Sequence, residues 1–580
     1  MTKPEDPDHR SRTAGILLPA FSPRREGDLG IGDTLAMREW IDWAAEHGVG
    51  FLELLPINET GADNSPYSAI SSVALEPLYL AMEPELVPGL EEKDLAAARA
   101  AISKALQKRR VDYPAVRRAK RKLLRAAWHR VEAAAKADSE FAAFRREEAV
   151  WLDEYVVFRW LMARSGNREA WDLWPKAYST PEAAREFVAS ERKRNAEFVD
   201  SELMFHAWVQ WLCFRQWREV RAYADQRGVK LMGDMPIGIS HDSHDVFFRP
   251  GEFDLNWFGG APPEHMFKHD RFIQQWGQNW GIPLYRWDEM EKNGWDWWRR
   301  RVEKLTEIFH IFRIDHVLGF YRIYAFPWHP RRNGEFLDLS PDQARELTGG
   351  PLPGWAPRPD DTPENKAANR ADGDKRLRMI LEAAGEAEVV AEDLGCVPDY
   401  VRPHLASLDI AGFRLPHWEV KPDGHVVPPA ELDECAFATY ATHDHDTIAA
   451  MWDGFRTNAT GQVDGLPREA VDGARFNLRL LSEFAGLPQP ADASRWPRYT
   501  NKIKWPLLDA LHASRPRYAA TMITDVFGMR KPFNRPGTVS PENWSLRLPW
   551  PASSLAANPE LQPECQRLAE SIRKGDRARS

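Results

Sequence analysis

Cysteine is scarce in this chain of 580 residues. The four cysteines, Cys213, Cys396, Cys435 and Cys565, are scattered, and no two of them have the C-x-x-C spacing. Such usage is typical of reduced thiols, and it disfavours both a disulfide framework and a structural zinc site.

Long apolar runs and an excess of positive charge are also missing. No stretch approaches the roughly 20 apolar residues that span a bilayer, and the first residues, MTKPEDPDHRSRTAG, lack the apolar core of a secretory signal. The net charge of −9 disfavours a polyanionic partner. We therefore expect a cytoplasmic protein that binds neither membranes nor nucleic acid.

Short apolar, β-branched runs are what the chain has instead. Eight of them begin at Gly15, Gly50, Val229, Ile308, Ala387, Asp409, Cys435 and Tyr518. Helical patterns such as DTLAMREWIDWAAEHG and DKRLRMILEAAGE lie between several of them. Eight buried strands alternating with helices predict an α/β fold, a closed (β/α)₈ barrel with helical insertions. A doubly wound open sheet is the alternative, but no G-x-G-x-x-G or G-x-x-x-x-G-K-[ST] motif follows any run.

Uneven spacing of these runs indicates insertions. We expect the barrel to begin in residues 14–84, a helix-rich insertion in 85–195, the rest of the barrel in 196–550, and a C-terminal helix and tail in 551–580. The Arg/Lys run inside the insertion is interpreted as a solvated helical face, because acidic stretches follow it. The Pro/Gly/Asp-rich stretch 347–374 predicts a long surface loop, which is either a lid over the site or a loop without a functional role.

Polar residues gather where four of the predicted strands end. In a (β/α)₈ barrel, working residues lie at the carboxyl ends of strands. The polar residues at these ends are Asp234, the pair Arg313 and Asp315, the pair Glu392 and Asp393, and the pair His443 and Asp444.

Several carboxylates around one cavity mouth are suited to cleaving a glycosidic bond. One carboxylate attacks the anomeric carbon, and a second, protonated, carboxyl group donates to the leaving oxygen. Arg313 next to Asp315 would favour its charged form, and the apolar neighbours of Glu392 would raise its pKa. A metal site in the run His443–Asp446 is a rival interpretation, although consecutive residues cannot all point inward.

Collinear motifs across nearly the whole chain resemble one enzyme family. They are GDLGIGD, LLPINETG, NSPYS, GDMPIGISHDSHDVF, GAPPEHMF, GQNWGIPLYRW, FRIDHVLGFYRIYAFPW, VVAEDLG, ATHDHDT and FNRPGTVSPENW. The chain resembles the 4-α-glucanotransferases, also called amylomaltases or disproportionating enzymes, which form glycoside hydrolase family 77 of the α-amylase superfamily.

The resemblance implies a role for each matching residue. Asp315 is implied to be the nucleophile, Glu392 the general acid/base, and Asp444 the carboxylate that stabilises the distorted sugar. Arg313, His443 and Asp234 match donor-site positions, Tyr67 matches a stacking tyrosine, and Gln278 and Trp280 match a motif that lines the groove. The implied partners are α-1,4-glucans and maltooligosaccharides, with glucose as an acceptor, and neither a cofactor nor a metal is implied.

Some positions depart from the family pattern. Ser68 replaces a glutamine, Glu76 an asparagine, and His445 an asparagine, while 264–266 differ in a loop whose capping aromatic would shift to Phe267 or be absent. These departures bear on acceptor preference and not on the three carboxylates. The expected activity is retaining transfer of an α-1,4-glucan segment in maltooligosaccharide and glycogen metabolism. An α-1,4-glucan hydrolase and a silent glucan-binding protein are the alternatives.

Overall fold

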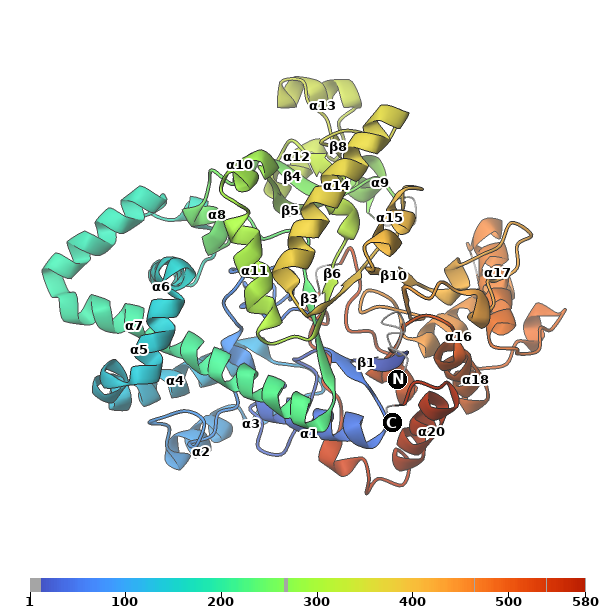
Figure 1. Ribbon diagram of the computed structural model, residues 1–580, viewed down its shortest axis with the longest axis horizontal. Coiled ribbons are helices and arrows are strands. Elements are labelled where there is room, and N and C mark those ends of the chain that lie inside the picture. The colour runs from blue at the N-terminus through green and yellow to red at the C-terminus, as the bar shows by residue number, and fades with distance from the viewer. Residues whose placement is uncertain (1–11, 265–269, 464, 539, 579–580) are drawn as a thin grey trace, which may run out of the picture.

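Eight parallel strands close into a barrel at the centre of the protein (Figure 1). The computed structural model describes residues 12–264, 270–463, 465–538 and 540–578. In barrel order the strands are β1 (Thr13–Leu17), β12 (Tyr518–Met522), β11 (Ala436–Ala438), β10 (Ala411–Arg414), β9 (Glu388–Ala391), β6 (Ile311–Ile314), β3 (Lys230–Met235) and β2 (Phe51–Glu53). Each overlaps one of the eight runs, although β1 begins two residues before its run, and the predicted (β/α)₈ barrel is confirmed.

Alternation along each strand separates the barrel interior from the layer under the helices. Ile311 belongs to a small core with Phe51 and Met232, whereas Phe312 and Ile314 belong to a different core cluster. The same alternation places Arg313 on the face of Ile311. The interior is therefore apolar at its base and becomes charged toward the carboxyl ends of the strands.

Helices surround the barrel and extend it on two sides (Figure 1). The N-terminal half contains α1 (Thr34–Glu46), α2 (Glu92–Ala101), α3 (Ser103–Leu106), α4 (Tyr113–Ala137), α5 (Ser139–Glu147), α6 (Ala149–Arg164), α7 (Pro181–Arg227), α8 (His244–Phe248), α9 (Arg271–Trp276), α10 (Trp287–Lys292) and α11 (Asp296–Thr306). The C-terminal half contains α12 (Asn333–Phe336), α13 (Pro341–Thr348), α14 (Pro363–Ala384), α15 (Val401–Ser407), α16 (Ile448–Ala459), α17 (Arg468–Phe484), α18 (Asn501–Ala513), α19 (Ile523–Val526) and α20 (Gln562–Lys574).

A second sheet stands apart from the barrel, and the sequence did not predict it. It is antiparallel, with strands in the order β5 (Gln278–Tyr285), β4 (Phe253–Ala261), β7 (Ile323–Phe326) and β8 (Gly354–Ala356). Its strands come from the segments that follow β3 and β6. Since these segments begin at the carboxyl ends of barrel strands, the sheet is built on the side of the barrel where the polar strand ends lie.

Helices α2 to α6 fill much of the stretch 85–195 and lie together beside the barrel (Figure 1). Helix α7 continues through the expected boundary at 195, where Asn195 has non-helical backbone angles (φ −157°, ψ 83°). Its second half packs against α1 of the barrel. The proposed division of the chain into segments stays a prediction.

The stretch 347–374 is not the surface loop that its composition suggested. It contains β8, and its second half is the beginning of α14. Thr362 caps this helix by accepting a hydrogen bond from the Asn365 N–H, and Pro363 occupies the first turn, where its missing N–H costs nothing.

The two ends of the described chain meet at one side of the barrel (Figure 1). Arg12 donates to the carbonyl of Gly575 at 2.8 Å, and Arg577 donates to that of Thr13 at 3.2 Å. None of the helices among the described residues has the length and apolarity needed to cross a membrane.

Candidate active site

Arg313 contacts three carboxyl groups in the charged layer at the barrel mouth. Its Nη1 lies 2.6 Å from Asp234 Oδ2, and its Nη2 lies 2.8 Å from Asp315 Oδ1 and 4.0 Å from Glu392 Oε2. The Asp234 and Arg313 side chains are buried, whereas 24% of the Asp315 side chain is exposed. Burial acts to lower the pKa of Arg313, but Asp234 and Asp315 raise it well above its usual value. A permanently charged guanidinium is thus shared among three carboxyl groups.

The strand register brings these groups together. Asp234 of β3 is paired with Arg313 of β6, and Arg313 is paired with Val390 of β9, two residues before Glu392. Neighbouring parallel strands therefore present Asp234, Arg313 and Glu392 at their carboxyl ends, as the sequence predicted.

Glu392 is held in place by backbone donors. Its Oε2 accepts the His316 N–H and its Oε1 accepts the Leu394 N–H, both at 2.9 Å. Burial raises the pKa of Glu392 to about 7, with Asp315 adding to the rise and Arg313 opposing it. Glu392 can consequently hold a proton near neutral pH, which a general acid requires.

Asp444 comes from the other side of the barrel, after β11. Its Oδ1 accepts a hydrogen bond from Asn534 Nδ2 at 2.6 Å, and its Oδ2 lies 3.4 Å from His443 Nε2. Burial disfavours the charge of Asp444, yet His443 and Asn534 lower its pKa below the usual range. Asp444 therefore stays ionised near neutral pH, where Glu392 can hold a proton.

Tyr67 connects the two sides of the mouth. Its hydroxyl donates to Asp234 Oδ2 at 2.7 Å, and its ring stacks on His443 with centroids 5.1 Å apart. Trp544 packs against both rings, 5.7 Å from each. These contacts bring the expected donor-site residues Tyr67, Asp234, Arg313 and His443 into one cluster with the three carboxylates.

The second sheet adds an aromatic wall. Trp280 of β5 is 38% exposed, and its ring meets that of His316 edge-on at 5.0 Å, while its indole N–H donates to Gln278 Oε1 at 3.3 Å. Trp418, in a short 3₁₀ turn after β10, is 48% exposed, and its ring centroid lies 5.5 Å from that of His445. In the described part of the chain, these are the two tryptophans among the exposed large apolar residues.

Four contributing residues were given no role at the sequence level. Asn534, Trp544, His316 and Trp418 all lie in quoted motifs or runs, but nothing local distinguished them. Glu53 at the end of β2 was also missed: it is 2% exposed, and burial raises its pKa to about 7. Its position at the end of a predicted barrel strand could have identified Glu53 as a candidate site residue.

Two of the residues that differ from the family pattern, Glu76 and His445, make local hydrogen-bond contacts. Glu76 Oε2 accepts hydrogen bonds from the Thr60 N–H and hydroxyl, and its Oε1 accepts the Leu78 N–H. His445 Nδ1 lies 2.8 Å from the Thr442 hydroxyl. Burial raises the pKa of Glu264, while Met266 and the proposed capping Phe267 lie outside the described residues.

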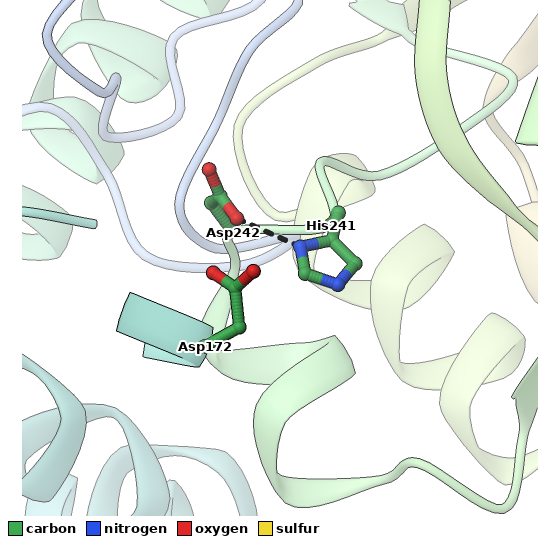
Figure 2. A group of neighbouring side chains, drawn as sticks. All are labelled: Asp172, His241 and Asp242. Atoms are coloured by element: carbon green, nitrogen blue, oxygen red, sulfur yellow. Dashed lines mark hydrogen bonds and ion pairs between the residues drawn. The ribbon is translucent and has the colours of Figure 1, made fainter. Parts of the chain in front are cut away.

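The group of described side chains that best resembles a metal site lies away from this cluster. It consists of Asp172, His241 and Asp242, whose ligand atoms lie within 4.8 Å of one another (Figure 2). Arg331 already pairs with Asp172 at 2.6 Å and with Asp242 at 3.1 Å. This charge balance makes the group an ion-pair network that joins the insertion to the segments after β3 and β7. Among the described residues, the run His443–Asp446 forms no comparable group.

Comparisons with known proteins agree with the geometry. The family described as 4-alpha-glucanotransferase matches residues 18–553. The 4-alpha-glucanotransferase of Chlamydia caviae is 31% identical over 92% of this chain and 90% of its own, and that of Thermus thermophilus is 30% identical over 93% and 95%.

Solved structures show the same fold. The amylomaltase of Streptococcus agalactiae, determined with acarbose, has a TM-score of 0.73 at 21% identity, with 98% of this chain and 100% of that one covered. The amylomaltase of Corynebacterium glutamicum has a TM-score of 0.71 at 20% identity, with 97% and 75% covered. The match over nearly the whole length, together with the fold, shows that this chain belongs to the 4-alpha-glucanotransferase family, enzymes that act on α-1,4-glucans.

Proposed function

We propose that this chain transfers a segment of an α-1,4-glucan to the 4-hydroxyl of glucose or of a maltooligosaccharide, through a covalent glycosyl-Asp315 intermediate. The setting we propose is maltooligosaccharide and glycogen metabolism in the cytoplasm. One observation carries the proposal: Asp315, Glu392 and Asp444 approach one barrel mouth around Arg313 in three different electrostatic settings.

The first half of the reaction uses Asp315 and Glu392. Asp315 Oδ1 is engaged by Arg313, whereas Oδ2 has no hydrogen-bond partner in the described part of the chain and is the oxygen that attacks the anomeric carbon. The glycosidic C–O bond breaks, and the leaving 4-oxygen takes the proton of Glu392. The glucan fragment on the reducing-end side departs, and the remainder stays bonded to Asp315.

The second half reverses these roles. Glu392, now a carboxylate, removes the proton from an acceptor 4-hydroxyl, whose oxygen attacks the anomeric carbon and displaces Asp315. Two inversions retain the α configuration. Asp444, which stays ionised, stabilises the positive charge that develops on the sugar in both transition states.

Carboxylate spacing is compatible with the retaining route. Oxygens of Asp315 and Glu392 lie 2.8 and 4.0 Å from the same guanidinium nitrogen and so cannot be further apart than the sum of these distances. Retaining glycosidases place theirs about 5 to 5.5 Å apart.

Transfer rather than hydrolysis requires a bound acceptor in place of water. Exposed Trp280 and Trp418 are suited to hold sugar rings, because indole faces stack on them. This arrangement favours transfer over the alternative, an α-1,4-glucan hydrolase.

The products formed from maltotriose test the proposal. A transferase gives glucose together with a ladder of longer oligomers, whereas a hydrolase gives only shorter sugars, and the difference is visible by chromatography. Asp315→Asn removes the nucleophile and should abolish both outcomes. A digest without longer products would refute the transferase, and wild-type inactivity would indicate a silent glucan-binding protein.

A further inference from the structure

A cavity lies between the barrel and the helical insertion. Its volume is about 390 Å³, and it is bounded by the segment 59–62 after β2 and by helices α4, α6 and α7. None of the candidate catalytic carboxylates lines it. A cavity of this size suits a small molecule.

Positive charge dominates the lining. Among the described lining residues, the cationic side chains are Arg117, Arg118, Lys120, Arg121 and Arg159, against the carboxylates Glu59 and Glu76. Four of the five are on α4, where Arg117 and Arg121 are spaced i, i+4 and Arg118 and Arg121 are spaced i, i+3. Like charges at these spacings face each other and destabilise a helix.

The two carboxylates are already engaged. Glu76 accepts three hydrogen bonds from Thr60 and Leu78. Glu59 accepts the Tyr155 hydroxyl at 2.5 Å and lies 3.0 Å from Arg159 Nε. Arg159 is therefore the cation that these acids neutralise most directly.

The cations of α4 have mostly neutral partners. Arg117 donates to Thr60 Oγ1, the Gly61 carbonyl and Asn64 Oδ1, and approaches Glu76 only to 3.9 Å. Arg121 donates to Asn167 Oδ1 at 2.8 Å. Exposed Arg118 has no hydrogen bond or ion pair to the described residues. Burial and the nearby Arg159 lower the pKa of Arg121. This shift shows that the neighbouring positive charges repel one another.

A buried imidazole completes the lining. His206 of α7 is 5% exposed, and its Nε2 has no hydrogen-bond partner in the described part of the chain. Burial and the charges of Arg159 and Arg125 lower its pKa well below the usual value, so the ring is neutral and its unpaired nitrogen can bond to a ligand. Buried polar atoms without partners are uncommon and call for an explanation.

We propose that this cavity binds a phosphate-bearing ligand the size of a hexose monophosphate, held by Arg117, Arg118 and Arg121 with His206 beneath them. Guanidinium forks match the oxygens of a phosphate, and a dianion would relieve the repulsion on α4. The ligand is distinct from the neutral glucans of the proposed reaction, and the site does not depend on that reaction.

Titration calorimetry of the full chain tests the site. The probes are inorganic phosphate, glucose 6-phosphate and maltotriose, at equal ionic strength set with chloride. We expect saturable binding of at least one phosphate probe with a Kd of about 1 mM or tighter. Tighter binding of glucose 6-phosphate would identify an ester as the ligand, and equal binding would identify free phosphate.

Variants locate the binding. Arg121→Gln and, independently, Arg118→Gln should each weaken it by roughly tenfold, as the loss of a charge-assisted hydrogen bond does. Lys122→Gln, an exposed neighbour on α4 outside the cavity, is the matched control and should leave Kd unchanged. The proposal fails if neither phosphate probe binds, if maltotriose displaces the bound phosphate probe, or if the control weakens binding as much as the two arginine variants.

Discussion

Arg313 shows why a charged pair is placed inside an apolar strand. Its guanidinium is buried at the barrel mouth and lies close to Asp234, Asp315 and Glu392. A buried charge without partners would cost several kcal/mol. The three carboxyl groups supply those partners, and they differ in exposure and in neighbours.

Glu392→Gln tests the proton donor. Since general acids contribute about 10²- to 10⁴-fold, turnover of maltotriose should fall by that order. A donor with a good leaving group, such as a glucosyl fluoride, needs no proton to form the ester with Asp315. The initial burst of fluoride release should therefore recover much of its rate, although the second half-reaction still lacks its base. Asp315→Asn is the matched comparison, because loss of the nucleophile cannot be rescued in this way. Equal impairment of Glu392→Gln on both donors would argue against its role as the acid.

The pH profile reports the same group. The pKa of Glu392 is raised to about 7, so the proton needed for donor cleavage is present below that pH and lost above it. The value of kcat/KM with maltotriose should therefore fall about tenfold per pH unit on the alkaline side of about 7. With the fluoride donor this alkaline decline should disappear, and its persistence would assign the decline to another group.

At the scale of elements, the second sheet is the main addition to the barrel. Its strands grow out of the segments after β3 and β6, and β5 places Trp280 beside His316, the neighbour of Asp315. Barrel strands thus carry the charged groups, while the second sheet carries an exposed aromatic surface at the same mouth.

Trp280→Ala tests the role of this sheet. Loss of a stacking surface should raise KM for maltooligosaccharides by up to about tenfold, equivalent to ~1.4 kcal/mol. Phe198→Ala is the control, because Phe198 is 48% exposed on α7 and belongs to no part of the site. Initial rates over a range of maltotriose concentrations measure the effect, and an unchanged KM would place sugar binding elsewhere.

For the whole molecule, helix α7 ties the insertion to the barrel. Gln216 is 1% exposed; its Oε1 accepts the Thr34 hydroxyl at 2.6 Å and the Ala81 N–H at 2.9 Å, and its Nε2 donates to the Ala81 carbonyl at 3.1 Å. These bonds fix the second half of α7 to the barrel, while the first half of the same helix lies in the insertion. Separate unfolding of the insertion would therefore interrupt this helix.

Gln216→Leu should therefore destabilise the whole protein. It removes the donor to the Ala81 carbonyl and the acceptor of the Thr34 hydroxyl. Leaving these buried groups without partners costs about 2 kcal/mol or more, and calorimetry should show one cooperative transition moved to lower temperature. Glu219→Ala on the same helix removes only the exposed pair with Arg38, for which about 0 to 1 kcal/mol is expected. Two separate transitions would show that the helical block folds independently.

Patterns along the chain were enough for the barrel and for the placement of several candidate site residues. Each of the eight runs became a barrel strand, because buried parallel strands are continuously apolar. The positions of Asp234, Arg313, Asp315 and Glu392 followed from the rule that strand ends share one face of the barrel. The capping signal Thr362-Pro363 was also present in the sequence. The composition of the stretch nevertheless predicted a surface loop, which is wrong where α14 begins.

Tertiary structure alone decided the rest. Asn534 and Trp544 reach the site from a loop far along the chain. The family resemblance named Trp280, but not the sheet that carries it, whose strands pair across long sequence separations. The raised pKa of Glu392 and the lowered pKa of Asp444 arise from burial and from neighbours that only folding brings near. Local sequence determines which side chains a strand presents and on which face, whereas proton affinity and contact depend on groups distant in the chain.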